Sequence, residues 1–170
     1  MARYELRTPI SREDADKLRV GDTVYLSGEI LCGRDAVLPK VVKLCEEGRL
    51  GELDADLEGQ VIFHTAVSPA GVGPTSSNKL EIESSIPALS QAGIRVHLGK
   101  GALKPETVRA LEENGSVYAV IPPVTALLEE KTTERRVVAF PELGMEALHM
   151  LRVDRYPAII AAAHGRSIYE

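Results

Sequence analysis

Short apolar segments alternate with helical segments along this chain of 170 residues, and that alternation constrains the fold more than any other feature. The apolar segments are rich in β-branched residues, which is typical of strands. We expect strands at residues 23–31, 60–67, 94–98, 116–121, 135–140, 148–153 and 157–163. We expect helices at residues 11–18, 35–47, 84–92 and 106–114, with one helical turn or two at 125–130.

Residues at the ends of these segments support the assignments. Ser11 is suited to cap the first helix, and Pro39 fits only near the first turn of the second. Pro105 opens the 106–114 helix, and Gly115 ends it. Residues 70–78 (AGVGPTSSN) read as a loop.

No internal repeat, low-complexity tract or long linker divides the chain. A length of 170 residues suits one ordinary domain with its own core. We therefore expect a single α/β domain with a mixed sheet, spanning residues 1–170.

Charge and composition argue against nucleic acid and membranes as partners. The formal net charge is −5, aromatic residues make up 4%, and there is no tryptophan for base stacking. The longest apolar run, residues 158–163, is far shorter than the roughly 20 residues of a membrane-spanning helix. The amino terminus lacks the apolar core of a signal peptide.

The two cysteines, Cys32 and Cys45, form no CxxC pair, which favours a reduced, cytoplasmic setting. Their neighbours offer no further ligands of the kind that a closed thiolate site needs. We expect both to be small buried side chains, with no metal bound by this chain alone.

Three glycine-containing junctions follow predicted strands and carry a cation or a hydroxyl. They are CGRD at 32–35, GPTSSNK at 73–79 and GKG at 99–101. Ligands gather beside strand ends in open α/β sheets, and glycine lets a ligand approach the backbone closely. Together Arg34, Lys79 and Lys100 could neutralise an anion with more than one negative charge.

Each junction also has a simpler interpretation when it is taken alone. Arg34 could lie in a turn as a solvated or ion-paired side chain, and Lys100 could simply be exposed. The GVGPTSS segment could be a flexible loop, and it lacks the spacing of a nucleotide phosphate loop. The order of all three in one chain favours a common site.

That order resembles the small (beta) subunit of class I fumarases and L-tartrate dehydratases over almost the whole chain. GDTVYLSGEILCGRDA is similar to the family's opening strand and arginine turn, GVGPTSS to its Gly-Pro-Thr loop, and GKGALKPE to its lysine turn. The most specific block is FPELGMEALHMLRVDRYPAIIAA, residues 140–163.

The resemblance implies a swivelling β/β/α domain that faces a larger alpha subunit with three cysteines and a 4Fe-4S cluster. Two cysteines cannot supply three thiolates, so the cluster would belong to that partner. The implied reaction is the reversible hydration of fumarate to L-malate, and the chain would be active only with its partner.

By the same resemblance, Arg34, Lys79 and Lys100 bind substrate carboxylate, and Thr75 aligns with a threonine proposed as the catalytic base. A neutral hydroxyl is a poor base, so Thr75 would need a neighbouring carboxylate and cations to activate it. It could instead be a hydroxyl that bonds its own loop backbone.

Two positions depart from the family's pattern. Leu38 stands where a histidine is common, and Lys79 stands where arginine is usual; an ammonium cannot reproduce the two-pronged grip of a guanidinium. These departures leave L-tartrate dehydration open as the activity, and also a non-enzymatic anion-binding or assembly module on the same fold.

None of the four histidines is assigned to the site. His64 lies inside an apolar segment and is expected to be a hydrogen-bonded core residue, whereas His97 could line the cleft. His149 and His164 have no recognisable constellation around them. The sequence does not determine whether copies of the chain associate.

Overall fold

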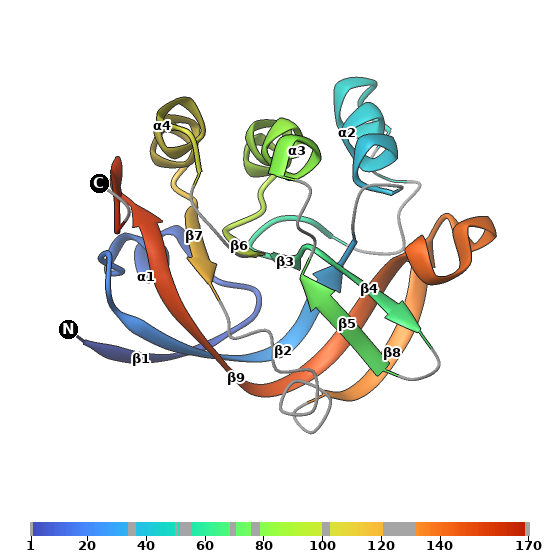
Figure 1. Cartoon of the computed structure of the whole chain (residues 1–170), viewed down its shortest axis with the longest axis horizontal. Helices are drawn as coiled ribbons and strands as arrows, with labels where there is room; N and C mark the ends of the chain where they lie inside the picture. The colour runs from blue at the N-terminus through green and yellow to red at the C-terminus, as the bar shows by residue number, and fades with distance from the viewer. Residues whose placement is uncertain are drawn as a thin grey trace.

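A closed circuit of five strands forms the centre of the computed structural model (Figure 1). The structure describes residues 2–33, 37–49, 51, 56–68, 71–75, 79–99, 103–120 and 132–168, and for 65–68, 71–75, 79–82, 133 and 145 it describes only the backbone. The circuit consists of β2 (Thr23–Cys32), β3 (Val61–Phe63), β6 (Val96–Gly99), β7 (Val117–Val120) and β9 (Leu148–Ala163). The first four run parallel in that order, and β9 closes the circuit by pairing antiparallel with both β7 and β2.

Further strands extend the sheet beyond this circuit. β1 (Arg3–Arg7) pairs parallel with β2, while β8 (Thr132–Ala139) and β10 (Arg166–Ser167) pair antiparallel with β9. A separate two-stranded sheet consists of β4 (Thr65–Ser68) and β5 (Gly71–Thr75). A 3-10 segment, η2 (Pro141–Glu146), joins β8 to β9. The prediction of a mixed α/β fold with a mixed sheet is confirmed.

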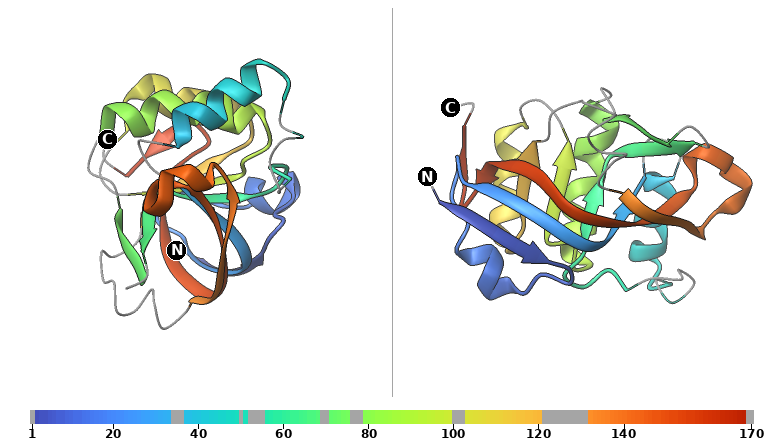
Figure 2. Two further views of the ribbon diagram at one scale, coloured as in Figure 1. Left: turned by 90° about the vertical axis from the view of Figure 1, so that its right-hand side faces the viewer. Right: turned by 90° about the horizontal axis from the view of Figure 1, so that it is seen from below.

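Three helices cover one side of the circuit, over β3, β6 and β7 (Figures 1 and 2). They are α2 (Leu38–Glu46), α3 (Lys79–Gln91) and α4 (Pro105–Glu113); the short α1 (Arg12–Asp16) lies apart from them. None of the helices in the described part of the chain is long and apolar enough to cross a bilayer.

The parallel strands are buried on both faces. In β3, Val61 and Phe63 point into the interior of the circuit, where Phe63 packs edge-on against Tyr156 at 6.4 Å between ring centroids. Ile62 points the other way, into the layer beneath α2 and α3, with Leu89. This double burial explains why these strands read as unbroken apolar runs.

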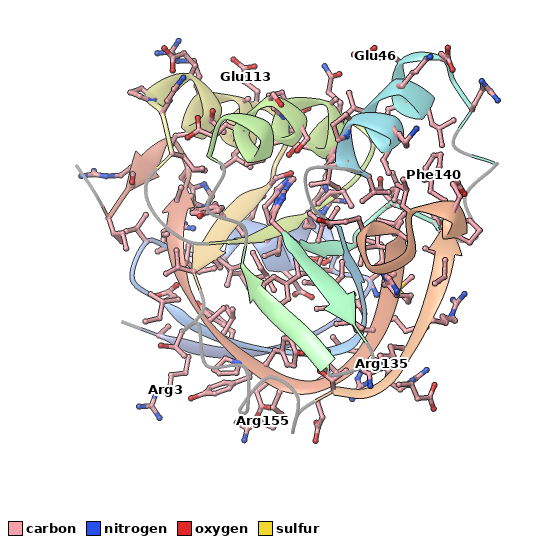
Figure 3. All side chains as sticks on the ribbon, turned by 45° about the vertical axis from the view of Figure 1, so that its right-hand side comes forward. Arg3, Glu46, Glu113, Arg135, Phe140 and Arg155 are labelled. Carbon is pink, nitrogen blue, oxygen red and sulfur yellow. The ribbon has the colours of Figure 1, made fainter. Side chains whose placement is uncertain are left out.

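Charged side chains lie on the outside of this arrangement. Glu46 on α2 and Glu113 on α4 point away from the sheet, and Arg155 lies on the opposite side of the molecule (Figure 3). Arg155 stacks over the Tyr25 ring at 4.5 Å and pairs with Glu5 at 2.8 Å. Such exposed pairs contribute little to stability.

The predicted helices are present, with altered ends. The Ser11 hydroxyl caps α1 by accepting from the Asp14 N–H at 3.0 Å, as expected. Helix α2 starts at Leu38 with Pro39 in its first turn, and α4 starts at Pro105. Helix α3 starts at Lys79, five residues before the predicted 84–92 segment. The predicted turn at 125–130 lies outside the described residues.

The strands differ from the predictions in four places. The 60–67 segment divides at His64 into β3 and β4, and the predicted loop at 70–78 contains β5. Strand β1 was missed because only Leu6 of its five residues is buried, so no apolar pattern marks it. The segments 148–153 and 157–163 are one strand, β9, which continues through Pro157.

Proline is tolerated within β9 because of the direction in which its nitrogen points. Ile160 bonds toward β2 with both main-chain groups: its N–H donates to Asp22 at 2.8 Å, and its carbonyl accepts from Gly21 at 2.9 Å. Main-chain groups alternate along a strand, so the Pro157 nitrogen faces away from β2. On that side β8 pairs with residues 148–153 and β7 with residues 159–162. Pro157 falls between these two stretches, where no described strand lies on that side. No ladder hydrogen bond is lost there.

Candidate active site

The carboxyl ends of four parallel strands meet at one edge of the sheet. Cys32 of β2, Phe63 of β3, Leu98 of β6 and Ala119 of β7 are aligned as successive partners. One residue further on, the Gly33 N–H donates to the Phe63 carbonyl at 3.0 Å, and the His64 N–H donates to the Leu98 carbonyl at 3.1 Å. Adjacent strands are about 4.8 Å apart, so Gly33 and Gly99 lie about 10 Å apart on either side of β3.

The two glycines at this edge are required by close neighbours. A Cβ atom at Gly33 would lie 2.8 Å from a methyl of Val37 and 3.1 Å from one of Leu38. A Cβ atom at Gly99 would lie 3.0 Å from the Tyr118 hydroxyl oxygen. Distances this short are rarely tolerated, so a larger residue would force the neighbouring side chains to shift just before Arg34 or Lys100.

The β4–β5 hairpin brings a third segment to the same edge. Thr65 directly follows His64 and is the register partner of Thr75, the last residue of β5. The chain then enters α3 at Lys79. The backbone of the GPTSSNK junction therefore starts beside the strand that separates Gly33 from Gly99.

Three helices also begin at this edge. Helix α2 follows β2, α3 follows the hairpin after β3, and α4 follows β6. The amino-terminal end of a helix carries partial positive charge and unpaired N–H groups, which favour anions. The edge is thus suited to a negatively charged ligand before any side chain is considered.

The predicted site residues are described to different extents. Arg34 and Lys100 lie outside the described residues, next to Gly33 and Gly99. For Thr75 and Lys79 the structure gives the backbone position, at the end of β5 and at the start of α3. The structure brings the chain segments together, whereas the convergence of the three cationic groups remains a prediction.

A buried histidine pair lies between the sheet and α3, close to this edge. The rings of His64 and His97 stack with centroids 6.0 Å apart and planes 19° apart, and neither is exposed. His97 Nε2 lies 2.8 Å from the Ser90 hydroxyl of α3. Burial, and secondarily the neighbouring His64, holds the pKa of His97 well below its usual value, so its ring is neutral at pH 7.

These positions qualify what the sequence predicted for the histidines. His97 was expected to be able to line the cleft, but it is buried against α3. His64 is buried as expected, yet its backbone stands at the edge between Gly33 and Gly99, a place that sequence reasoning did not assign. Its place directly after the apolar run that forms β3 is the sequence feature that could have indicated this position.

Leu38 contributes to packing and brings no polar group to the edge. It is the first residue of α2 and is 1% exposed, in a cluster with Val37, Val41 and Leu44. One of its methyls lies against Gly33. The residue that departs from the family's pattern therefore packs against Gly33, the residue before Arg34.

The described cysteines do not suit an iron–sulfur cluster. Cys32 is fully buried in the circuit's interior, and burial raises the pKa of its thiol, which disfavours the thiolate that iron requires. Cys45 is half-buried on α2, and burial is the main cause that raises its thiol pKa. No group of three or more His, Cys, Asp or Glu in the described part of the chain is arranged to hold a metal ion.

The sequence matches the family described as "Fumarase C-terminus" over residues 1–170. The L(+)-tartrate dehydratase subunit beta of Escherichia coli (strain K12) is 29% identical over 177 residues, covering 96% of this chain and 85% of that protein. A Methanocaldococcus jannaschii protein provisionally named as the same subunit is 32% identical over 176 residues, covering 95% and 88%.

A third relative is a longer protein. A Geobacillus stearothermophilus protein provisionally named as a class I fumarate hydratase is 30% identical over 179 residues. The alignment covers 97% of this chain but 33% of that protein. The region similar to this chain is therefore one part of a larger polypeptide in that case.

Proposed function

Because the chain belongs to the fumarase C-terminus family, as a beta subunit of the tartrate dehydratase and class I fumarase hydro-lyases, we propose that it helps to hydrate fumarate reversibly to L-malate. The observation that carries this proposal is the adjacency of Gly33, His64 and Gly99 at one sheet edge. Arg34 and Lys100 directly follow two of these residues.

In this proposal the chain supplies the positive charge that the substrate needs. Removal of the carbon-bound proton becomes easier when the adjacent carboxylate can accept more negative charge, and fixed cations stabilise that state. Arg34, Lys79 and Lys100 are assigned to the carboxylate. The partial positive charge at the amino-terminal ends of the three helices that begin at this edge would add to the electrostatic field of these cations.

Thr75 is the proposed base, and its backbone position supports that role. It ends β5 beside Thr65, directly after the edge residue His64. A threonine hydroxyl needs help to lose its proton, so a carboxylate from the partner together with the nearby cations is required. The proposal assigns that carboxylate to the alpha subunit.

We place the 4Fe-4S cluster on the alpha subunit. The buried Cys32 and the half-buried Cys45 are poorly suited to ligate it, and two thiols are too few in any case. The chain would then act in the cytoplasm as one swivelling β/β/α domain, residues 1–170, that closes over a site completed by its partner.

L-tartrate is the second candidate substrate, favoured by the names of the relatives that match along most of their length. Malate and tartrate differ by one hydroxyl, and Leu38 presents no polar group at the edge that could recognise it.

Reconstitution with the alpha subunit tests the proposal. The two-chain complex is assembled without oxygen and assayed with fumarate, L-malate and L-tartrate. We expect kcat/KM to be higher for fumarate than for L-tartrate. A preference for L-tartrate would replace the substrate assignment, and turnover of neither would overturn the proposed function.

A further inference from the structure

We propose that Glu83 is a positioning residue for this site: from α3 it holds the first turn of α4, and thereby the chain that leads from Lys100 into that helix. The inference rests on the proposed function. The Glu83 carboxylate is occupied by the Thr107 hydroxyl and the Lys104 N–H, so it would act through the segment that it holds.

The contacts of Glu83 are those of a helix cap supplied by a neighbouring helix. Its carboxylate is nearly buried, and Oε2 accepts a hydrogen bond from the Thr107 hydroxyl at 2.9 Å. The main-chain N–H of Lys104 donates to both carboxylate oxygens at 3.3 Å. Lys104 is the N-cap residue of α4 and has no capping hydrogen bond from its own side chain.

Glu83 thus does for α4 what a capping side chain normally does. The first N–H groups of a helix have no partner within it, and a carboxylate there also interacts favourably with the helix dipole. Because Glu83 and Thr107 are buried, removing the carboxylate would leave the Thr107 hydroxyl without a described acceptor, and the Lys104 N–H would lose its acceptor as well.

Both ends of the segment that contains Lys100 are fixed by described contacts. At one end, Gly99 pairs with Val120 of β7 and lies against the Tyr118 ring. At the other end, Leu103 packs against the apolar cluster beneath α3 and α4, next to the Glu83 contact. Glu83 also lies one helical turn after Lys79, so it connects the two helices that border the lysine-bearing junctions.

A positioning role and a purely structural role predict different kinetics. A structural defect reduces the amount of folded complex, which lowers the maximal rate but leaves the KM of the remaining complex unchanged. A displaced Lys100 weakens the grip on substrate carboxylate, so KM rises in correctly folded complex.

The reconstituted complex is assayed with four variants. Glu83→Ala is expected to lower kcat/KM about tenfold, mainly through KM, and Thr107→Val to act in the same direction by less. Glu83→Gln keeps an acceptor oxygen and should restore most of the loss. Glu106→Gln is the matched control, since Glu106 is an exposed carboxylate in the same first turn, and its KM should match wild type.

A KM for Glu83→Ala within about twofold of wild type would overturn the inference, whatever happens to stability. A second measurement keeps this result separate from the proposed function. Hydrogen exchange of the full-length chain alone should show faster exchange at Lys104 in Glu83→Ala than in Glu106→Gln. If the wild-type complex turns over neither substrate, the proposed function fails. Unchanged exchange at Lys104 in Glu83→Ala would independently refute the role of Glu83 in holding the first turn of α4.

Discussion

Arg34 and Lys100 are 66 positions apart in the chain, yet the residues before them lie at one sheet edge with only β3 between them. The glycines at 33 and 99 are closely packed against neighbouring side chains, directly before each cation. Charges that are fixed in advance stabilise a developing anion without reorganisation at the moment of reaction.

We therefore predict that Arg34→Ala and Lys100→Ala each lower kcat of the reconstituted complex at least about a hundredfold while leaving folding intact. Circular dichroism and steady-state kinetics with the preferred substrate would check both parts. Lys43→Ala is the control, because Lys43 is an exposed cation on α2. Turnover equal to wild type in both site variants would refute the assigned roles.

His97 leads to a prediction about pH and stability. The folded state holds its pKa well below the usual 6.5, so the folded ring stays neutral while the unfolded ring can take a proton. The contribution of the neutral His97 ring to the free energy of unfolding is therefore complete above about pH 6.5. It is lost as pH falls toward the pKa of the folded state, by up to about 1.4 kcal/mol per pH unit. Urea unfolding between pH 7.5 and 5.5 measures this loss.

The variant His97→Gln removes the titrating ring but keeps a polar group near Ser90. Its free energy of unfolding should be lower than that of wild type at pH 7.5 and should fall less steeply with decreasing pH. Parallel pH profiles for the two proteins would show that His97 is not the group responsible. His149, whose pKa burial also lowers, would then be the next candidate.

At the residue level, the sequence could predict which junctions matter but not what supports them. Glycine next to a cation after an apolar run is a local pattern, and Gly33 and Gly99 do lie at a common edge. Glu83 and His64 carry no such local signal. Their surroundings come from residues 21 to 33 positions away, Lys104 and His97, which only the folded chain brings near.

At the scale of single elements, α1 offers a clean test of a local signal. The Ser11 hydroxyl accepts from the Asp14 N–H at 3.0 Å, which satisfies one of the unpaired donors at the start of the helix. Ser11→Ala should lower the free energy of unfolding by about 1 kcal/mol, whereas Ser11→Asp should retain it. Equal urea midpoints for all three proteins would contradict the capping role.

The elements that the sequence predicted less well share a physical cause. The division of 60–67 at His64 and the pairing of β5 with β4 depend on hairpin contacts that no periodicity reveals. Pro157 suggested a break, but its nitrogen faces the gap between the stretches of β9 that pair with β8 and with β7, where no described strand lies. In each case tertiary position decided the outcome over local propensity.

At the scale of the whole molecule, β9 determines how the circuit closes. β2 pairs with β9 from residue 149 to residue 159, and β7 pairs with residues 159–162. A strand near the end of the chain thus joins both ends of the parallel set. Alternating segments predicted an α/β fold, but parallel strands alone would leave an open sheet. The closure follows from the antiparallel return of β9, which depends on contacts distant in sequence.

Closure also bears on which subunit holds the iron. Cys32 is enclosed within the circuit, so a cluster bound there would have to open the core, and Cys45 lies in a different cluster on α2. We predict that the double variant Cys32→Ala, Cys45→Ala, assembled with the alpha subunit, keeps the iron content and the kcat of wild type. Iron and sulfide analysis of the purified complex, alongside anaerobic turnover, measures both. A parallel loss of iron and activity in correctly folded complex would place a ligand on this chain and contradict the assignment of the cluster to its partner.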